Sequence, residues 1–484
     1  MTLDVEFQNA VFRYRAMDSL LGDRKELEKQ TIYFAPPEQL NDPMEGLRQL
    51  YWRGDRITWQ NFLRHYVICL HDRFFQCLVA GDDLTLTNTI GVFRYLKNFP
   101  TPQAQNLCEE CITAIEGQEL HAALLDLLES VDRNISFDEL LQLLRTVHSD
   151  WLIAVHGAFH RHQLVTQAPR LRPQSKNLAA SLRVVRENIP HALDQLGNSG
   201  WEIMNEIQQK LADEMNLLVA YQNLDVISPN RTSLILEFPR QYLNSLMKLV
   251  YPPWYVACFS THNDNAAMWS YYANNHNGCC LVFNTKATEG GRTLRLKGVN
   301  GYGTDGVLKG QQNLMLEPVR YTTDDQRIEF FTNIGRLSHR DLMQNWFQDE
   351  SGKTSSLAQH LSNETNRQWR DAYWENFSPP LFRKLPDWQH EQEYRIILSD
   401  ALNLYESDEG RTFTYDCDTL DGIIFGINVS VSDEARVMQI VDQKLHEESV
   451  ARGFTFYQAR YNQRLGKIEV LPLRLIRHRK NRAK

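Results

Sequence analysis

The stretch from Tyr255 to Phe283, YVACFSTHNDNAAMWSYYANNHNGCCLVF, gives the clearest indication of the fold. Residues 255–259 form a short apolar run with aromatic and β-branched side chains, which predicts a buried strand. Asn and Asp at 263–265 predict a helix start, because their side chains accept hydrogen bonds from the first free N–H groups. The helix continues through residues 266–273, a run of Asn, His and Gly ends it, and residues 279–283 predict a returning strand.

Two hydroxyl residues, Ser260 and Thr261, stand where the first of these strands ends. At that position they would face whatever fills a neighbouring cleft. A strand with a polar exit, a short aromatic helix and a returning strand together make a suitable frame for a ligand. An ordinary crossover in the protein core would have the same pattern, so both interpretations stay open at this point.

The overall composition is that of a globular protein with a sizeable core. A chain of 484 residues predicts roughly two to four domains, and 42% of the residues are hydrophobic. The net charge of -8 and the isoelectric point near 6.0 argue against a general nucleic-acid-binding protein. Residues 476–484 form a basic tail, which we interpret as solvated, with contact to RNA or a membrane as the alternative.

Nothing in the sequence predicts a membrane span or a signal peptide, and we expect a cytoplasmic protein with no membrane partner. The eight cysteines are scattered through apolar surroundings, which is typical of buried free thiols in a reducing compartment. Cys108 and Cys111 form a lone C-x-x-C pair without a second pair at zinc spacing. We therefore expect no metal site.

Between about residues 56 and 239 the character of the chain changes to leucine-rich stripes at helical spacing. Such stripes occur at 120–131, at 140–151 and at 211–219. Stripes of this kind are usually core between packed helices, so this part predicts a helical domain.

Two short acidic segments lie on either side of this helical part. Asp42 belongs to the Asn-Asp-Pro turn of LNDPME, and Glu391 and Glu393 directly precede a predicted strand at 394–398. In an extended segment Glu391 and Glu393 would point to one side, where mutual repulsion tends to raise one pKa. Acid–base or cation-stabilising chemistry would explain the pair. Solvated glutamates paired with Lys384 or Arg395 would explain it equally.

Five motifs in order resemble the bacterial domain-of-unknown-function (DUF) 2971 family. They are FRYR, LNDPMEG, the central stretch, WQHEQEYRI and DGIIFG, and together they cover about residues 1–55 and 240–475. The chain departs from the family in having Leu40 where the family has Phe and Tyr271 where it often has His. The resemblance implies one α+β core domain from these two parts, with residues 56–239 as a helical insertion. It implies no activity.

The same motifs are similar, more distantly, to the Arg–Ser–Glu layout of ADP-ribosyltransferases. Those enzymes open with an aromatic–arginine strand, here Phe12-Arg13-Tyr14-Arg15, and either Arg13 or Arg15 would be the equivalent arginine. Their Ser-Thr strand corresponds to Ser260 and Thr261, and their Glu-x-Glu to residues 391–393. The chain lacks a Gly after the first arginine and a full Ser-Thr-Ser. The resemblance implies an ADP-ribosyltransferase-like split β-sheet core with a large all-α insertion.

This second resemblance implies a role for each candidate residue in cleaving NAD. Glu393 would stabilise the oxocarbenium-like ribose, Glu391 would act on an acceptor, and Ser260 would hold the ribose or the nicotinamide amide. Arg15 would bind the diphosphate bidentately. The remaining cofactor-binding candidates, which would line or back the same pocket, are Tyr14, Asp42, Thr261, Trp269 and Tyr272.

The resulting hypothesis is an NAD-dependent ADP-ribosyltransferase or NAD glycohydrolase, in the setting of a bacterial toxin or phage-defence effector. NAD would be substrate, with an unidentified macromolecular acceptor. One alternative is a non-catalytic interaction or sensor protein whose helical insertion binds a protein partner. The other is a metal-dependent nuclease built on Asp42, Glu45, Glu391 and Glu393.

Overall fold

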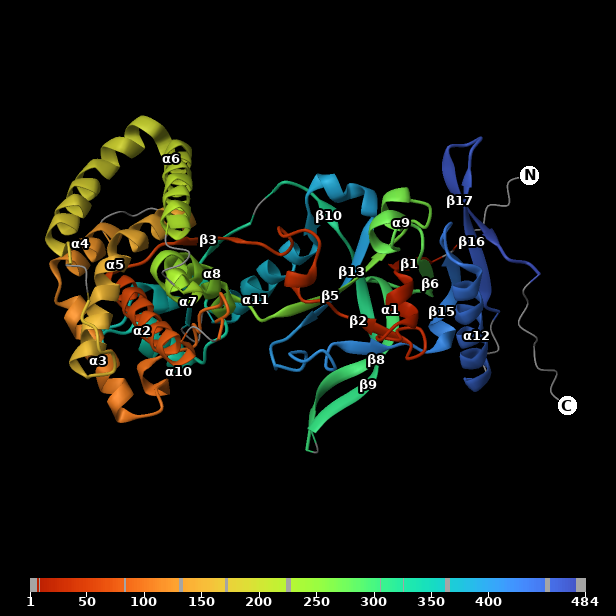
Figure 1. Cartoon of the computed structure of the whole chain (residues 1–484), viewed down its shortest axis with the longest axis horizontal. Helices are drawn as coiled ribbons and strands as arrows, with labels where there is room; N and C mark the ends of the chain where they lie inside the picture. The colour runs from red at the N-terminus through yellow and green to blue at the C-terminus, as the bar shows by residue number, and fades with distance from the viewer. Residues whose placement is uncertain are drawn as a thin grey trace. The chain divides into compact units, whose positions relative to one another are not determined.

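The computed structural model in Figure 1 describes residues 7, 9–81, 84–129, 134–169, 173–222, 228–304, 306–324, 326–361, 366–448 and 453–475. The predicted basic tail, residues 476–484, lies outside them. The chain divides into two compact units. Unit 1 comprises Met1–Leu47, Pro253–Asp324 and Phe377–Lys484, and unit 2 comprises Arg48–Pro252 and Asp325–Asn376.

This division differs from the predicted one, which assigned all of residues 240–475 to the core domain. Residues 325–376 belong instead to the helical unit. The reason is aromatic packing: the Phe331 ring makes edge contacts with Trp59 and Phe62 of the first long helix. The cap of that helix adds a polar link, because Asp55 accepts hydrogen bonds from Ser355 Oγ and Ser356 N.

Unit 1 is built on one sheet with twelve strands among the described residues. Its order is β17-β16-β15-β6-β1-β5-β13-β9-β8-β14-β2, with β7 paired to β8. The strands are β1 (Ala10–Arg15), β2 (Thr31–Tyr33), β5 (Trp254–Ser260), β6 (Cys279–Asn284), β7 (Lys286–Thr288), β8 (Gly291–Gly303), β9 (Gly306–Pro318), β13 (Glu393–Ser399), β14 (Thr412–Thr414), β15 (Leu420–Phe425), β16 (Thr455–Asn462) and β17 (Lys467–Pro472).

The sheet splits in its middle, between β1 and β5. These two strands pair at a single position, Phe12 opposite Ser260. Further along the same edge of β5, Val256 pairs with Ala35, which follows β2 at the far end of the strand order. The sheet therefore curls. Over four residues, this edge of β5 changes its neighbour from β1 to the segment that follows β2. We call the place where β1 and β5 separate the fork. The candidate site lies there.

Helices cover the two faces of this sheet. One apolar face includes Phe259, Leu281 and Phe283 and packs against α12 (Val431–Glu447). The other face packs against α9 (Ala266–Tyr272), whose N-cap Asn265 accepts from the amides of residues 267 and 268. The predicted strand, helix and returning strand of the central stretch are thus confirmed as β5, α9 and β6.

Short elements complete unit 1. They are α1 (Met17–Leu21), the 3-10 helices Pro37–Gln39, Pro379–Phe382, Pro386–Glu391 and Cys417–Thr419, and the paired strands β10 (Arg320–Tyr321) and β12 (Arg383–Lys384).

Unit 2 is a helical bundle around the buried helix α2, as the leucine-rich stripes predict. Its helices are α2 (Arg56–Ala80), α3 (Pro102–Glu116), α4 (Glu119–Glu129), α5 (Phe137–Arg161), α6 (Ser175–Gln222), α7 (Pro229–Thr232), α8 (Phe238–Val250), α10 (His339–Leu342) and α11 (Asn366–Phe377). A small sheet is formed by β3 (Gln49–Trp52), β4 (Ile135–Ser136) and β11 (Arg327–Glu329). Among the described helices, none has both the length and the apolar character needed to cross a membrane.

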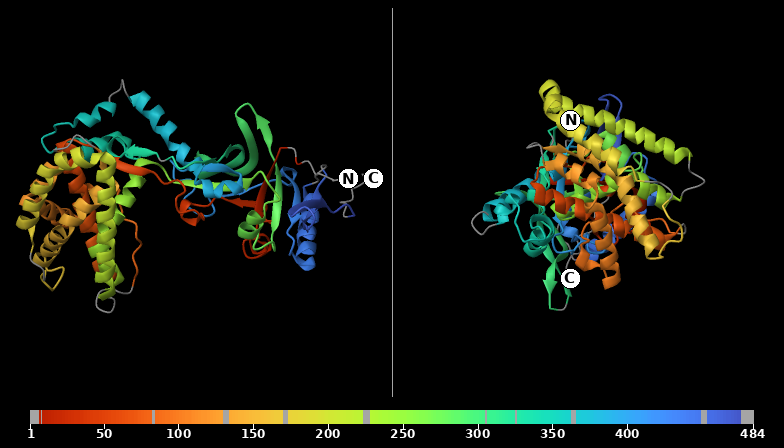
Figure 2. Two further views of the ribbon diagram at one scale, coloured as in Figure 1. Left: turned by 90° about the horizontal axis from the view of Figure 1, so that it is seen from above. Right: turned by 90° about the vertical axis from the view of Figure 1, so that its left-hand side faces the viewer.

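The predicted burial of one leucine-rich stripe is wrong. The stripe at 211–219 lies on α6, which Gly197 bends into two arms that are visible in Figures 1 and 2. Leu211, Met215 and Leu218 are exposed on the second arm, and the buried side chains there are Trp201, Asn205 and Gln209. The spacing predicts a helix correctly, but spacing alone does not say which face of the helix is covered.

Candidate functional site

The fork in the unit 1 sheet contains a pocket of about 520 Å³. Small-molecule sites usually have volumes of about 300–1,000 Å³, so the pocket has the size of a ligand site. It is lined by Phe12, Arg13, Tyr14, Arg15, Arg24, Tyr33, Ala35, Gln39, Leu40, Asn41, Glu45, Val256, Cys258, Phe259, Ser260, Met268, Tyr272, Lys384, Glu391 and Glu393.

Strand register brings the predicted serine and glutamate together. Glu393 is the direct partner of Ser260 across the antiparallel pair β13–β5, so the two side chains leave the same face of the sheet. Glu391 reaches the pocket by another route than the predicted extended segment. It ends the 3-10 helix, and Gln392 takes a left-handed conformation with φ of 45° before β13 begins.

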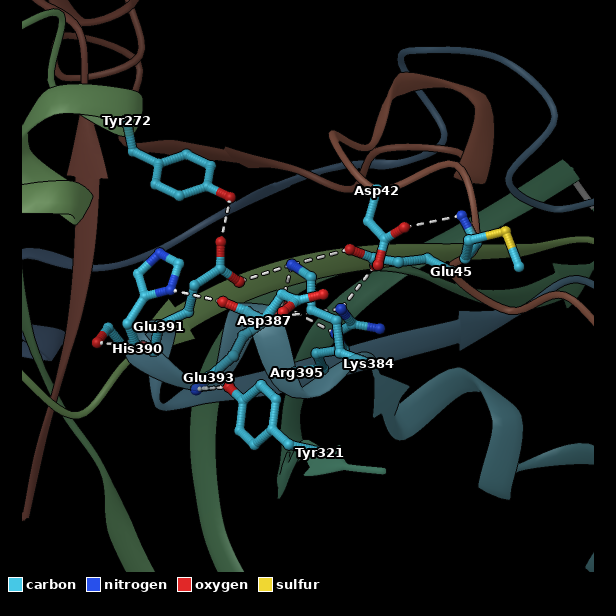
Figure 3. Close-up of polar contacts among 12 residues, drawn as sticks. Asp42, Glu45, Tyr272, Tyr321, Lys384, Asp387, His390, Glu391, Glu393 and Arg395 are labelled. Atoms are coloured by element: carbon cyan, nitrogen blue, oxygen red, sulfur yellow. Dashed lines mark hydrogen bonds and ion pairs between the residues drawn. The ribbon is translucent and has the colours of Figure 1, made fainter. Parts of the chain in front are cut away.

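A buried ionic cluster forms one side of the pocket, with Lys384 at its centre (Figure 3). The Lys384 Nζ atom lies 2.9 Å from Glu45 Oε1, 2.6 Å from Glu391 Oε2 and 3.5 Å from Glu393 Oε2. These four side chains are at most 5% exposed. The Trp388 ring lies 4.7 Å from the same ammonium group and adds a cation–π contact. One lysine therefore holds three carboxylates in place.

Arg395 is the second cation of this cluster and is fully buried. Its Nε and Nη2 atoms donate to the two carboxylate oxygens of Glu393 at 2.8 and 2.9 Å. Nη2 also donates to Glu45 at 2.6 Å, and Nη1 donates to the backbone carbonyl of Leu381. With three carboxylates and two cations, the cluster carries one negative charge when all five groups are ionised.

Burial and ion pairing shift the pKa values of two carboxyl groups of the cluster in opposite directions. Burial alone would raise the pKa of Glu393, but the Arg395 guanidinium outweighs it and holds that pKa below its usual range. At Glu45 burial prevails, and the nearby Glu393 carboxylate adds to it, so the pKa of Glu45 is raised. The carboxyl group of the cluster whose pKa is raised is thus Glu45, with burial as the main cause. From the sequence, we expected the raised pKa at either Glu391 or Glu393.

Glu391 connects the cluster to the helix α9. Its Oε1 atom accepts a hydrogen bond of 2.6 Å from the Tyr272 hydroxyl. Burial, together with this carboxylate, raises the pKa of Tyr272, so the phenol stays protonated and keeps donating. The Ser260 hydroxyl donates at 2.8 Å to the backbone carbonyl of Glu391, which fixes the position of that residue.

The other side of the fork is cationic. Arg15 is held by Glu26, to which its Nε donates at 2.7 Å and its Nη2 also donates. The Arg13 guanidinium donates from Nη2 to the Tyr33 carbonyl at 3.2 Å, and it lies over the Phe259 ring. Among the described residues, Arg13 Nη1 has no hydrogen-bond partner although it is buried. Burial, helped by the nearby Arg15, lowers the pKa of Arg13 to about 10.

The remaining predicted cofactor residues lie at the edge of the pocket or behind it. Tyr14 lines it, but its hydroxyl donates to the His262 carbonyl, and its ring packs edge-on against Trp269. Trp269 is fully buried and belongs to the core behind the fork. The Thr261 hydroxyl points to the Gln392 carbonyl at 3.4 Å. Neither Trp269 nor Thr261 is among the lining residues.

Asp42 also lies outside the lining. Its Oδ1 atom accepts from the Met44 amide at 2.9 Å, which closes the turn that carries Glu45 into the cluster. Its other oxygen is buried and has no hydrogen-bond partner among the described residues. The predicted acidic turn thus contributes to the site through Glu45, three residues further on.

Three residues that contact the carboxylates of the cluster or their backbone were missed or undervalued from the sequence. Lys384 and Arg395 were considered as surface partners of the glutamates, yet both are buried at the centre of the cluster. Tyr321 was missed, and its hydroxyl accepts a hydrogen bond of 2.8 Å from the Glu393 amide. Burial raises the pKa of Tyr321 to about 12. A signal was available for Arg395, because its position in an apolar strand predicts that it is paired when buried.

The described residues contain no group of three or more His, Cys, Asp or Glu side chains that would hold a metal ion. Glu45, Glu391 and Glu393 converge on one point, but the Lys384 ammonium group stands there. All eight cysteines are free thiols, and seven of them are buried. Cys108 and Cys111 lie inside α3 as part of its buried face.

Comparison with known proteins identifies part of this region. Residues 268–396 match the family model described as "Protein of unknown function (DUF2971)". The match supports the DUF2971 resemblance, and it runs from α9 into β13, so it contains Tyr272, Lys384, Glu391, Glu393 and Arg395. Arg13, Arg15, Glu45 and Ser260 lie outside it. No curated protein and no solved structure matches the chain.

Proposed function

We propose that unit 1 binds NAD in the fork pocket and breaks the bond between nicotinamide and ribose, as an ADP-ribosyltransferase or an NAD glycohydrolase. The observation that carries the proposal is the composition of one pocket. A partly unpaired guanidinium group lines it from β1, and buried carboxylates line it from the β13 side. NAD has matching parts, an anionic diphosphate and a ribose that becomes cationic as its bond breaks.

The diphosphate end would lie against Arg13. Its Nη1 is a charged donor without a partner among the described residues, and charge-assisted hydrogen bonds to phosphate are among the stronger ones. Arg15 is already paired with Glu26, so it would contribute charge at longer range. The prediction left open which arginine faces the ligand, and the hydrogen bonds favour Arg13.

The nicotinamide ribose would lie against Glu391 and Glu393. A developing oxocarbenium ion is stabilised by a fixed negative charge that needs no reorganisation during the reaction. Glu393 meets that condition, because Arg395 fixes both of its oxygens and keeps its pKa low. Glu391 is held by Lys384 and Tyr272, and it would orient the attacking water or acceptor.

A non-catalytic binding or sensor protein is the second candidate, and one observation favours it. Both carboxylates are bonded to internal cations, which reduces the negative charge that they offer to a substrate. The nuclease alternative has less support, because a metal ion at the three carboxylates would have to displace the Lys384 ammonium group. A toxin or phage-defence role would follow from the consumption of NAD.

The test is to incubate the purified chain with NAD and to measure free nicotinamide, with and without a cell extract as acceptor source. Wild type should release nicotinamide, and Glu393→Gln should lower turnover by about 10²–10⁴-fold. Glu391→Gln should mainly reduce transfer to the acceptor and leave slow hydrolysis in place. Absence of nicotinamide from wild type under both conditions would contradict the catalytic proposal and favour the binding protein.

A further inference from the structure

The second arm of α6 in unit 2 carries an exposed apolar face. Ile203 is 56% exposed, Ile207 53%, Leu211 61%, Met215 60% and Leu218 52%. Spacings of three and four residues place these side chains on one side of a helix, and we call them the α6 stripe. A surface helix normally presents polar residues there, and contiguous exposed apolar patches mark interaction sites.

Polar contacts fix the orientation of this arm within unit 2. Glu202 pairs with Arg327 at 2.7 Å, and Trp201 Nε1 donates to Glu139 at 3.0 Å. Asp213 pairs with Arg145 at 2.7 Å and with Arg240 at 2.6 Å. These contacts come from the face opposite the stripe. The arm therefore cannot turn its apolar side inward without breaking several ion pairs.

One pair of opposite charges on the arm is self-complementary about residue 212. Lys210 and Glu214 lie two residues before and after this point, on the same flank of the stripe, and Lys210 also pairs with Glu206 of its own helix at 2.7 Å. In two antiparallel copies related by a two-fold axis at residue 212, Lys210 of one copy faces Glu214 of the other. The same operation brings Ile203 opposite Tyr221, which is 73% exposed. Such an isologous contact repeats each favourable pair twice.

We propose that the chain forms a two-fold symmetric dimer through the α6 stripe, with the second arms of two copies packed antiparallel. From Ile203 to Tyr221 the arm spans about 27 Å at 1.5 Å per residue. One helix pair of this length is smaller than the about 1,200–2,000 Å² of a standard stable interface. The dimer is therefore concentration-dependent, with a dissociation constant on the order of micromolar. The proposal is independent of NAD chemistry.

The experiment is sedimentation equilibrium of the full chain from about 1 to 100 µM, a range around the expected dissociation constant. Wild type should pass from monomer to dimer. Leu211→Glu places two charges near the axis and should weaken the dimer by about tenfold or more. Val79→Glu is the matched control, because Val79 is 72% exposed in unit 2 but lies on α2, so this variant should dimerise like wild type.

Charge reversal tests the antiparallel axis itself. Lys210→Glu and Glu214→Lys should each weaken self-association by about fivefold, since each turns two attractive pairs into repulsive ones. An equimolar mixture of these two single variants should associate again, because every pair across the axis is then opposite in charge. The double reversal should restore self-association in the same way.

Several results would overturn the proposal. They are a wild type that stays monomeric at about 100 µM, a dimer that Leu211→Glu leaves intact, and a mixture of the charge variants that does not associate. Thermal melting separates a folding defect from a lost interface, because the substituted residues are exposed and should leave the melting temperature unchanged. A Leu211→Glu variant that melts well below wild type would show that the stripe is covered within the chain, which would also overturn the proposal.

Discussion

Two sets of buried polar side chains, one in each unit, are satisfied differently. In unit 2, His65 donates from Nε2 to the Val92 carbonyl at 2.9 Å and is hydrogen-bonded through Nδ1 to the Tyr242 hydroxyl at 2.8 Å. His148 repeats the pattern with the Leu234 carbonyl and the Tyr66 hydroxyl, each at 2.9 Å. In both cases the histidine is neutral and each of its ring nitrogens has a hydrogen-bond partner. We call these arrangements closed neutral pairs.

In unit 1 the buried cluster around Lys384 is charged, and it lines a pocket. The cluster around Lys384 has one carboxylate more than it has cations. Across the fork, Arg13 keeps a donor that has no partner in the part of the chain that the structure describes. Closed neutral pairs need no ligand and serve the fold. Charged groups that are left partly unsatisfied beside a cavity indicate a place reserved for a ligand. This contrast is the reason for placing the function in unit 1.

The largest expected effect comes from removing the centre of the charged cluster. Lys384→Met would leave the three buried carboxylates with Arg395 alone as the cation of the cluster, and should cost about 3–5 kcal/mol in the free energy of unfolding. The cost should be smaller at pH 5 than at pH 8, because protonation of Glu45, whose pKa is already raised, relieves the repulsion. Denaturant unfolding at both pH values measures it.

Lys309→Met is the matched control for this variant. The pair between Lys309 and Glu409 is exposed, so its loss should cost about 0–1 kcal/mol. A Lys384→Met variant as stable as this control would show that the cluster contributes little to unit 1.

The next effect is acid sensitivity of unit 2. Burial lowers the pKa of His65, His71, His121 and His148 to about 4, below the ordinary value of about 6.5. The unfolded chain therefore binds more protons between these values, so stability is full above pH 6.5 and falls as the pH drops toward 4. Each histidine should cost about 1.4 kcal/mol per pH unit in that window. Hydrogen exchange of unit 2 peptides at pH 7 and 5.5 measures the loss.

Two variants at one pair sharpen this result. His148→Phe removes one titrating group and should reduce the pH slope. Tyr66→Phe keeps the histidine but loses its hydrogen bond, so it should lower stability by about 1–3 kcal/mol with little change in slope. Equal slopes in wild type and His148→Phe would be inconsistent with a neutral buried His148.

The smallest effect on stability is expected from replacing Arg13. Arg13→Gln should change the free energy of unfolding by less than about 0.5 kcal/mol, because Nη1 has no partner among the residues described and the buried guanidinium is costly to desolvate. Arg15→Gln should cost about 1–3 kcal/mol, because it leaves the buried Glu26 carboxylate unpaired. Thermal melting of the two variants compares them directly, and equal losses would mean that Arg13 serves the fold.

Local patterns in the sequence predicted the elements of the fold well. The strand, the Asn-capped helix and the returning strand of the central stretch form as predicted, because propensity and capping act within a few residues. The covered face of α6 was not predictable in this way. It depends on ion pairs such as Glu202 with Arg327, whose partners are far apart in the chain.

At the site, Ser260 and Glu393 lie side by side as predicted, but the side chains that hold Glu393 in place were not predicted. Register at the fork sets Glu393 opposite Ser260, and both had been selected from their motifs. The central position of Lys384 was hidden, because a lysine in a polar segment is usually solvated. Trp269 was a plausible ring-stacking residue by sequence, but it lies one layer behind the pocket, in the core under α9.

Equilibrium binding of a non-cleavable NAD analogue tests the central claim most directly. The carbocyclic analogue, in which a carbon atom replaces the oxygen of the nicotinamide ribose ring, would be titrated calorimetrically into wild type and into Arg13→Gln. Wild type should bind one analogue per chain, and Arg13→Gln should bind it about 10–100-fold more weakly, as expected for one charged hydrogen bond to phosphate. Absence of binding to wild type, or equal affinities for the two proteins, would contradict a fork pocket built for NAD.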